Sequence, residues 1–391
     1  METLPEFDDA MKALRDLRTE VVAQVLATGA ADPGHVAAFA QLHDELAALP
    51  RVGDRYVLRL DELAIATDLS YELAELRKDL VFLREGPQAL LDHLAAIHHD
   101  FASEVDRVVA ALGGVWFDNF VTDRDGTISN YCGRYASSIQ AVYNAVFLTR
   151  FARACAGHAV VVTSAPLRDP GIASVSTMPP GTVVFAASKA RELLHPDGGV
   201  RTFPIDPAQQ AVLDRFNARV RALVREPAYV KFSWIGSGVQ FKFGETTLAR
   251  QDHVGTIAPG ESAAWRARIE RLRDEVDPNL AVLEIVDTGL DLEVTLKTGD
   301  HAAFSKAHGL RFVDQALGLG LGHGRTLVCG DTRGDVPLLA ACMEAGAEVD
   351  CVFVTRDDAL ARDVRAMCPR AVVVSEVDAL VVALDRCAAV A

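Results

Sequence analysis

Residues 123–129 read Asp-Arg-Asp-Gly-Thr-Ile-Ser and follow an apolar-leaning run at 115–121 that predicts a short buried strand. Gly126 allows the chain to turn sharply where it leaves that strand. Two carboxylates beyond a strand end can converge on one cation and one electrophile, and Mg²⁺ prefers such oxygen ligands. The stretch therefore predicts a nucleophile at Asp123 and an acid/base group at Asp125. A calcium loop or a plain acidic turn is the alternative for these residues taken alone.

The size and charge of the chain narrow the classes of function. Its 391 residues suffice for two domains and a helical addition, and the composition of 50% hydrophobic and 24% charged residues is typical of globular proteins. The formal net charge of −15 argues against nucleic-acid and anionic-membrane partners. The sequence shows no secretory signal pattern and no apolar run of membrane-spanning length, so we expect a cytoplasmic protein.

The seven cysteines are an odd number and include no Cys-x-x-Cys pair. This spacing argues against a zinc knuckle or a thioredoxin-like site. We expect free thiols in a reducing compartment.

Residues 1–115 have the apolar spacing of helices, which we expect near 6–31, 36–49, 70–82 and 87–112. Residues 55–60 are expected to form a short strand or an extended linker. The region contains no recognisable catalytic set, and we assign it to packing or homo-oligomerisation. His98 and His99 are adjacent on a predicted helix and point in different directions, so ordinary surface is favoured over a metal site.

Strands alternate with helices from Trp116 onward, which is typical of a parallel sheet, and the first of these helices is expected near 137–156. An apolar strand at 159–164 ends in Thr163 and Ser164, whose hydroxyls can meet an anion at the carboxyl edge of the sheet or cap the next turn. Lys306 opens a predicted helix, and a second acidic loop at 331–335 follows a buried strand at 326–330.

The region 169–299 has a different, mixed pattern. Helices are expected near 207–224 and 261–276, with strands at 239–243, 281–286 and 290–296. We interpret this region as an inserted α+β unit. The glycines within 236–238 allow either close approach to a ligand or a hairpin bend.

The order of these pieces (Asp123-x-Asp125, Thr163, Lys306 and the loop 330–335) resembles the haloacid dehalogenase-type phosphatase superfamily with a type-2 cap. The resemblance implies an α/β fold with a Rossmann-like parallel-sheet core at 116–168 and 300–391. It further implies an inserted α+β cap at 169–299, beside the N-terminal helical region 1–115.

The resemblance also implies roles for individual residues. Asp123 would form an aspartyl-phosphate, while Asp125 would protonate the leaving oxygen and then activate water. Thr163 and Lys306 would hold the phosphoryl oxygens. A cation and an ammonium group provide the charge that phosphoryl transfer requires.

The same resemblance implies a Mg²⁺ site. Asp123, Asp331 and the backbone carbonyl of Asp125 would bind the ion, and Asp335 would be a second-shell or alternative ligand. Opposite charges near Asp123 would keep it ionised.

Some positions depart from the superfamily pattern. Arg124 stands between the two aspartates, where an apolar residue is common. Ser164 follows Thr163, where sugar-phosphate phosphatases with this cap often have Gly-Arg, so Ser164 is an alternative phosphate contact. Lys297 is the alternative to Lys306.

A narrower resemblance rests on residues 123–127, 130–135, 163–167 and 244–248 and on the helical N-terminal region. These segments resemble the glucosylglycerol-phosphate phosphatases, which act in osmolyte synthesis, and next the trehalose-6-phosphate phosphatases. The resemblance implies a Mg²⁺-dependent hydrolase acting on a small phosphorylated sugar or glycoside, with glucosylglycerol 3-phosphate as the first expectation. Phosphotransfer to an alcohol and a non-catalytic binding protein are further alternatives.

Specificity is expected to reside in the insert and in the loop after residue 129, because every phosphate monoester presents the same group to the core. On the strand 239–243, Gln240 and Lys242 share one face, which we expect to look into the cleft. The candidate substrate-binding residues are Arg134, Ser164, Lys231, Gly236, Gly238, Gln240, Lys242 and Glu245.

Overall fold

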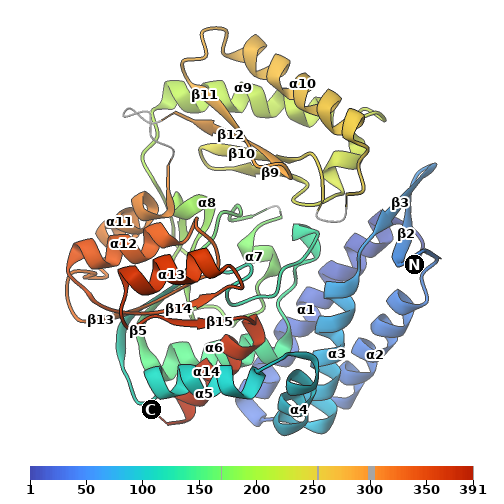
Figure 1. Cartoon of the computed structure of the whole chain (residues 1–391). Helices are drawn as coiled ribbons and strands as arrows, with labels where there is room; N and C mark the ends of the chain where they lie inside the picture. Colours follow the sequence, from blue (N-terminus) through green and yellow to red (C-terminus); the bar gives the residue numbers. More distant parts are fainter. Residues whose placement is uncertain (169, 253–254, 298–303, 391) are drawn as a thin grey trace.

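The structure is a computed structural model that describes residues 1–168, 170–252, 255–297 and 304–390. Figure 1 shows the N-terminal helices at the right, a central α/β part at the left and a smaller α+β part, with α9 (Pro207–Leu223) and α10 (Pro259–Val276), at the top. The domain boundaries expected at 168/169 and 299/300 involve residues 169, 299 and 300, which lie outside the described residues.

The central part is built on an eight-stranded sheet of order β15-β14-β13-β4-β5-β6-β7-β8. The strands from β15 to β6 run parallel, and β7 and β8 are antiparallel. Its strands are β4 (Phe117–Thr122), β5 (Ala156–Val162), β6 (Val184–Ala186), β7 (Glu192–Leu194), β8 (Val200–Thr202), β13 (Arg325–Gly330), β14 (Glu348–Val354) and β15 (Val372–Val374). The expected α/β class with a parallel-sheet core is confirmed.

The topology corrects one part of the expected division. Strands β6, β7 and β8 fall within the range assigned to the insert, yet they extend the core sheet beyond β5. Each is three residues long, too short to show a recognisable period. The short element α8 (Ala187–Ala190) between β6 and β7 contains a left-handed turn without glycine, at Ser188, Lys189 and Ala190.

Helices cover both faces of this sheet. The residues of α6 (Val142–Cys155) and α14 (Val377–Ala389) pack on one face, and those of α11 (Lys306–Leu317), α12 (Val336–Ala345) and α13 (Asp358–Met367) pack on the other. A helix was expected from residue 137, but 135–137 form the 3₁₀ turn η1 (Tyr135–Ser137) and α6 begins at Val142. The short helix α7 (Ile172–Val175) lies after β5.

The N-terminal bundle, residues 4–112, consists of five helices and a small antiparallel sheet. Its elements are α1 (Leu4–Thr28), α2 (Pro33–Ala47), β1 (Arg51–Val52), β2 (Arg55–Leu60), β3 (Leu63–Thr67), α3 (Ser70–Glu85), α4 (Pro87–Ile97) and α5 (Phe101–Leu112). The single helix expected at 87–112 is divided into α4 and α5. His98 is extended and Asp100 adopts a left-handed conformation, with φ of 59°, at the break.

The two histidines at this break differ. The side chain of His99 is 94% exposed, as expected for a surface residue. His98 was also expected at the surface, and this prediction is wrong. Its Nε2 lies 2.7 Å from Oδ2 of the fully buried Asp378 on α14. The partner lies 280 residues away in sequence, so local spacing could not indicate it.

The α+β part above the core, residues 207–296, is called the cap below. Its four-stranded antiparallel sheet has the order β11-β12-β10-β9 and packs against α9 and α10 (Figure 1). The elements are α9 (Pro207–Leu223), η2 (Val230–Ser233), β9 (Val239–Lys242), β10 (Glu245–Ala249), α10 (Pro259–Val276), β11 (Leu283–Asp287) and β12 (Asp291–Leu296). The cap has its own hydrophobic core, in which the buried Trp265 stacks on Phe232 with ring centroids 4.6 Å apart.

Within the described residues, none of the helices combines the length and the apolar character needed to span a lipid bilayer. All seven cysteines are free thiols, and all but Cys132 are buried.

Candidate active site

A cavity of about 270 Å³ lies between the carboxyl ends of the parallel strands and the cap sheet. We call its core side the floor, formed by Asp123, Asp125, Thr163, Ser164, Lys306, Asp331 and Asp335. We call its cap side the roof, formed by Gly236, Ser237, Gln240, Lys242, Asp291 and Glu293. Floor residues that are far apart in the sequence therefore line the same cavity as residues of the insert.

The floor follows from the sheet topology. Asp123 comes directly after β4, Thr163 after β5 and Asp331 after β13. Because β4 lies between β13 and β5 and all three are parallel, their carboxyl ends meet at one edge. The backbone N–H of Asp123 donates to the carbonyl of Cys329 at 3.0 Å, which ties two of these strand ends together.

The Lys306 ammonium group lies between two carboxylates of the floor. It contacts Oδ1 of Asp123 and donates to Oδ1 of Asp335 at 2.6 Å. The N–H and hydroxyl of Thr332 donate to the other oxygen of Asp335 at 2.9 and 2.8 Å. Although burial opposes the shift, the Lys306 charge lowers the pKa of Asp335. Lys306 is therefore placed to neutralise part of the negative charge of the floor.

Three carboxylates gather at one point of the floor. Asp123, Asp331 and Asp335 each offer an oxygen, and these atoms lie within 4.8 Å of one another. Thr127 donates to Asp331 at 2.9 Å. Gly126, at φ +87°, leaves room for Asp331, since a Cβ there would lie 2.3 Å from a carboxylate oxygen.

The electrostatics of this cluster match a cation site. Burial raises the pKa of Asp123 to about 7. Burial, reinforced by the neighbouring carboxylates, raises the pKa of Asp331 to about 8. A bound divalent cation would favour the charged forms of both groups. The all-oxygen donor set is the kind that Mg²⁺ prefers, so the residues fit the expected ion.

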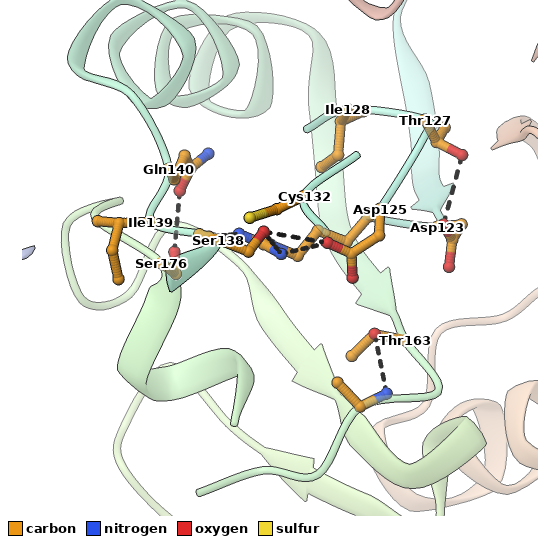
Figure 2. A network of polar contacts seen from close by, with 12 residues as sticks. Asp123, Asp125, Thr127, Ile128, Cys132, Ser138, Ile139, Gln140, Thr163 and Ser176 are labelled. Carbon is orange, nitrogen blue, oxygen red and sulfur yellow. Dashed lines mark hydrogen bonds and ion pairs between the residues drawn. The ribbon is translucent and has the colours of Figure 1, made fainter. Parts of the chain in front are cut away.

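Asp125 is oriented differently from the other aspartates. Figure 2 shows its carboxylate directed toward Ser138, whose hydroxyl lies 3.4 Å from Oδ1. The same oxygen is contacted by Nη1 of Arg124. Its side chain is 26% exposed and lines the cavity. A side chain turned away from the carboxylate cluster but toward the cavity suits proton transfer better than metal binding.

The sequence left two choices open, that between Lys297 and Lys306 and that between Thr163 and Ser164, and the structure distinguishes only the lysines. Lys297 donates to the carbonyl of Leu280 at 2.7 Å and lines a separate cavity, which leaves Lys306 as the lysine of the floor. Thr163 and Ser164 both line the cavity. The Thr163 hydroxyl accepts from the backbone of Ala165 at 3.1 Å and still has its own proton to donate.

On the cap side, β9 has the alternation expected from its sequence. Gln240 and Lys242 line the cavity, while Val239 and Phe241 pack against the cap core. Lys242 donates to Glu245 at 3.0 Å, and Gln240 donates to the carbonyl of Ser237 at 3.0 Å. These contacts hold the polar face of the strand in place above the floor.

Glu245 was expected in the cavity, but it lies outside the lining. Its side chain is 2% exposed beneath Lys189, Lys242 and Arg191. Although burial opposes the shift, these cations lower its pKa to about 2. Because β10 is an inner strand of the cap sheet, Glu245 is enclosed by its neighbours and anchors Lys242.

Three other candidates also lie outside the lining. Lys231 pairs with Glu261 on α10. Gly238 shapes a turn, with φ of 65°, and bonds within the cap. Arg134 is buried, stacks over Phe7 and lines a smaller cavity beside the bundle.

Sequence reasoning missed other lining residues. Asp291 and Glu293 face the cavity from β12, whereas Leu292 and Val294 pack in the cap core. This alternation was visible within the predicted strand 290–296 and could have identified both acids. Tyr131 also lines the cavity; it lies in the loop after residue 129, which was expected to contribute to specificity, but it was not among the candidate residues.

Comparison with known families shows which family the chain belongs to. Residues 120–380 match the family described as trehalose-6-phosphate phosphatase, C-terminal, and residues 3–101 match the N-terminal helical bundle domain of trehalose-6-phosphate phosphatase. The chain belongs to the trehalose-6-phosphate phosphatase family. The first match contains every strand of the core and cap sheets except the first three residues of β4.

Relatives within this family include longer proteins. The chain is 32% identical, over 95% of its length, to an alpha,alpha-trehalose-phosphate synthase [UDP-forming] of Aphelenchoides avenae, but spans only 34% of that protein. It is 26% identical to a trehalose-phosphatase of Caenorhabditis briggsae, covering 90% of this chain and 89% of the relative. The chain therefore spans about a third of the synthases and most of the phosphatase.

Solved structures similar to this chain include the trehalose-6-phosphate phosphatase of Aspergillus fumigatus, at 14% identity and a TM-score of 0.38, covering 75% of this chain and 98% of that one. The C-terminal domain of the C. albicans enzyme has 12% identity and a TM-score of 0.45, with the same coverage.

The family matches correct the narrower expectation from sequence. Glucosylglycerol-phosphate phosphatase was the first choice and trehalose-6-phosphate phosphatase the second, and the matched families support the second. Two of the four segments behind the first choice, 123–127 and 163–167, supply the floor residues Asp123, Asp125, Thr163 and Ser164. They carry little information about the leaving group.

Proposed function

We propose that this chain hydrolyses the phosphate monoester of a disaccharide, trehalose 6-phosphate, through a phosphorylated Asp123. The carrying observation is the convergence of Asp123, Lys306, Asp331 and Asp335 on the floor of a cavity with a polar roof. Membership of the trehalose-6-phosphate phosphatase family supports the choice of substrate.

The first chemical step is attack of an Asp123 carboxylate oxygen on phosphorus. A P–O bond forms to Asp123 while the P–O bond to the sugar breaks, and the sugar oxygen leaves with a proton. Lys306, already in contact with Asp123, and the hydroxyl of Thr163 or Ser164 would bind the phosphoryl oxygens. Preorganised positive charge and donors of this kind stabilise the charge that develops on these oxygens.

Asp125 would supply the proton to the leaving oxygen and later accept one from water. Water then attacks phosphorus, releases inorganic phosphate and regenerates the Asp123 carboxylate. The separation of roles follows from the two environments. Asp123 lies among the carboxylates beside Lys306, whereas Asp125 is held apart by Arg124 and Ser138.

Mg²⁺ would be held by the carboxylates of Asp123 and Asp331, with the Asp125 carbonyl and Asp335 as the further ligands expected from the superfamily. When bound, it supplies positive charge to the phosphoryl group during transfer. Asp331 is oriented for this role by the Thr127 hydroxyl.

The roof would bind the sugar. Gln240 and Lys242 offer donors, and Asp291 and Glu293 offer acceptors, across the cavity from the floor. A disaccharide presents hydroxyl groups that require both kinds of partner. The roof thus matches a polyhydroxylated leaving group better than an apolar one.

The test is release of inorganic phosphate by the purified chain from trehalose 6-phosphate, glucosylglycerol 3-phosphate and glucose 6-phosphate, each with Mg²⁺ and with chelator. We expect the largest kcat/KM for trehalose 6-phosphate and loss of activity in chelator. Preference for another sugar phosphate would overturn the substrate. Sugar production without free phosphate would indicate phosphotransfer, and no turnover would favour a non-catalytic binding protein.

A further inference from the structure

A chain of buried contacts leads from Asp125 into the bundle. Arg124, 2% exposed, contacts Asp125 through Nη1. The same nitrogen donates to the Ser138 hydroxyl at 3.0 Å, and Nη2 donates to the Ser138 carbonyl. One guanidinium group therefore connects Asp125 to residue 138 on the adjoining loop.

The bundle holds the next residue of that loop. The carbonyl of Ile139 accepts from Nη1 of Arg18 at 2.7 Å and from the Tyr71 hydroxyl at 3.1 Å. Arg18 is in turn fixed by Asp79, whose Oδ2 accepts from Nε at 2.8 Å. The other Asp79 oxygen accepts from the N–H of Val142, the first residue of α6, at 2.7 Å.

These groups are isolated from solvent. Arg18 is 1% exposed and Asp79 is fully buried. Together with their partners they come from four parts of the chain, namely α1, α3, the loop before α6 and the start of α6. Moving residues 138–139 would break the buried hydrogen bonds from Arg18 and Tyr71, which solvent could not replace, so the arrangement allows this segment little movement.

We propose that Arg124 is a positioning residue for the acid/base carboxylate Asp125, and that the N-terminal bundle sets its position through Arg18 and Tyr71. The inference rests on the proposed phosphatase function. It changes the role of residues 1–115, which the sequence assigned to packing or oligomerisation alone. Binding of Oδ1 by Arg124 and Ser138 leaves Oδ2 of Asp125 to meet the substrate.

The consequence is specific to substrates whose leaving group needs a proton. An alkoxide from a sugar leaves poorly without one, whereas 4-nitrophenolate leaves readily. The value of kcat/KM reports only the steps up to departure of the leaving group, because the later attack of water on the phosphorylated Asp123 does not enter it. Misplacement of an acid group by about 1 Å can cost about 10²-fold.

The test measures kcat/KM of the full chain with Mg²⁺ for trehalose 6-phosphate and for 4-nitrophenyl phosphate. We expect Arg124→Met to lose about 100-fold on the sugar phosphate and less than about threefold on the aryl phosphate, at the low end of general-acid effects. Tyr71→Phe, which removes one hydroxyl, should lose about fivefold on the sugar phosphate alone, since one hydrogen bond contributes about 1 kcal/mol. Arg124→Lys should recover only part of the loss because an ammonium group cannot make the two-pronged contact.

Glu104→Gln is the matched control. Its carboxylate accepts from the N–H of Ser375 at 3.0 Å, so it also joins the bundle to the core, but away from residues 138–139. We expect the same small change, if any, on both substrates. In the Arg124→Met background, the effect of Tyr71→Phe should disappear, because the two residues act through one chain of contacts.

Equal losses on the two substrates in Arg124→Met and Tyr71→Phe would overturn the inference, as would full additivity of these two substitutions. A wild-type chain that releases phosphate from neither substrate would overturn the proposed function, and the inference with it. Should Arg124→Met not fold, Tyr71→Phe alone decides between these results.

Discussion

The N-terminal bundle and the cap both lie outside the catalytic core, but they are joined to it in different ways. Bundle residues such as Phe7 and Leu76 belong to the same hydrophobic cluster as Phe120 of β4. The cap side chains around Trp265 form a cluster of their own. The bundle therefore shares one hydrophobic cluster with the parallel-sheet part, whereas the cap is stabilised mainly by its own hydrophobic cluster.

The polar contacts show the same contrast. Lys78 of the bundle donates to the buried carboxylate of Asp378 on α14 at 2.8 Å. Between core and cap, Lys189 donates to Glu245 at 2.8 Å and to Glu293 at 3.2 Å, and the second partner lines the cavity. A fixed floor and a separately folded roof suit the proposed function, in which the substrate must enter between them.

The left-handed turn that carries Lys189 has a strained backbone conformation. Ser188, Lys189 and Ala190 all have positive φ, which side-chain-bearing residues rarely adopt. Such strain persists where the surroundings fix it. A Cβ added at Gly309 on α11 would lie 2.0 Å from the Lys189 carbonyl, so α11 passes directly against this turn.

Removing each part tests the comparison most strongly. Deletion of residues 1–112 should give insoluble or non-cooperatively unfolding protein, because it exposes the apolar surfaces of α6 and α14 on which the bundle packs. Replacement of residues 206–297 by a short flexible linker should leave a soluble core. Soluble yield and thermal unfolding measure both outcomes. A cooperative transition in the bundle deletion would contradict the shared core.

Substitutions of single lysines test the same comparison between bundle and cap, with smaller expected losses of stability. Lys78→Met should lower the free energy of unfolding by about 3 kcal/mol, because it removes the buried cation between Glu75 and Asp378, although His98 still contacts Asp378. Lys189→Met should lower it by about 1 kcal/mol, since this pair is partly exposed and Glu245 keeps Lys242. Urea denaturation compares the two variants. Equal losses would mean that the cap and the bundle are attached equally firmly.

Gln240→Ala tests whether the roof binds the sugar. We expect kcat/KM for trehalose 6-phosphate to fall about fivefold to tenfold, since a hydrogen bond contributes about 1–1.5 kcal/mol. Hydrolysis of 4-nitrophenyl phosphate should stay unchanged. Gln210→Ala on the outer helix α9 is the matched control, because Gln210 bonds only to Asp214 among the contacts of its side chain that the structure describes. A loss on both substrates would place Gln240 in the support of the fold.

The pH dependence of stability in chelator tests the carboxylate cluster of the floor. The pKa of Asp331 is raised to about 8, so the folded chain holds a proton that the unfolded chain has lost above about pH 4. Stability should therefore fall as the pH rises from about 5 to 8. Asp331→Asn should flatten this slope, and Mg²⁺ should stabilise the wild type more at pH 8 than at pH 5. A slope unchanged by the substitution would refute the assignment.

The floor could be predicted from sequence because its residues sit at the ends of recognisable strands. Asp123, Thr163 and Asp331 each follow an apolar run, and parallel strands must bring their ends to one edge. The side of the strand on which Gln240 and Lys242 lie likewise followed from the alternation within that strand. Where a side chain's position follows from its own strand, spacing is enough.

The remaining features depend on distant partners. His98 is paired by Asp378, and Glu245 is enclosed by cations that include Lys189 and Arg191 of the core. Neither arrangement follows from nearby residues. Arg124 seemed merely a departure from the superfamily pattern, because its partner Ser138 lies on a loop that the sequence placed in a helix.

The central claim is that Asp123 is the nucleophile of a phosphatase site, and one substitution tests it directly. Phosphate release from trehalose 6-phosphate with Mg²⁺ is measured for the wild type and for Asp123→Asn, with circular dichroism to verify the fold. We predict steady release by the wild type and none by the variant, because an amide cannot form the acyl phosphate. Release by a folded Asp123→Asn at a rate close to that of the wild type would contradict the account.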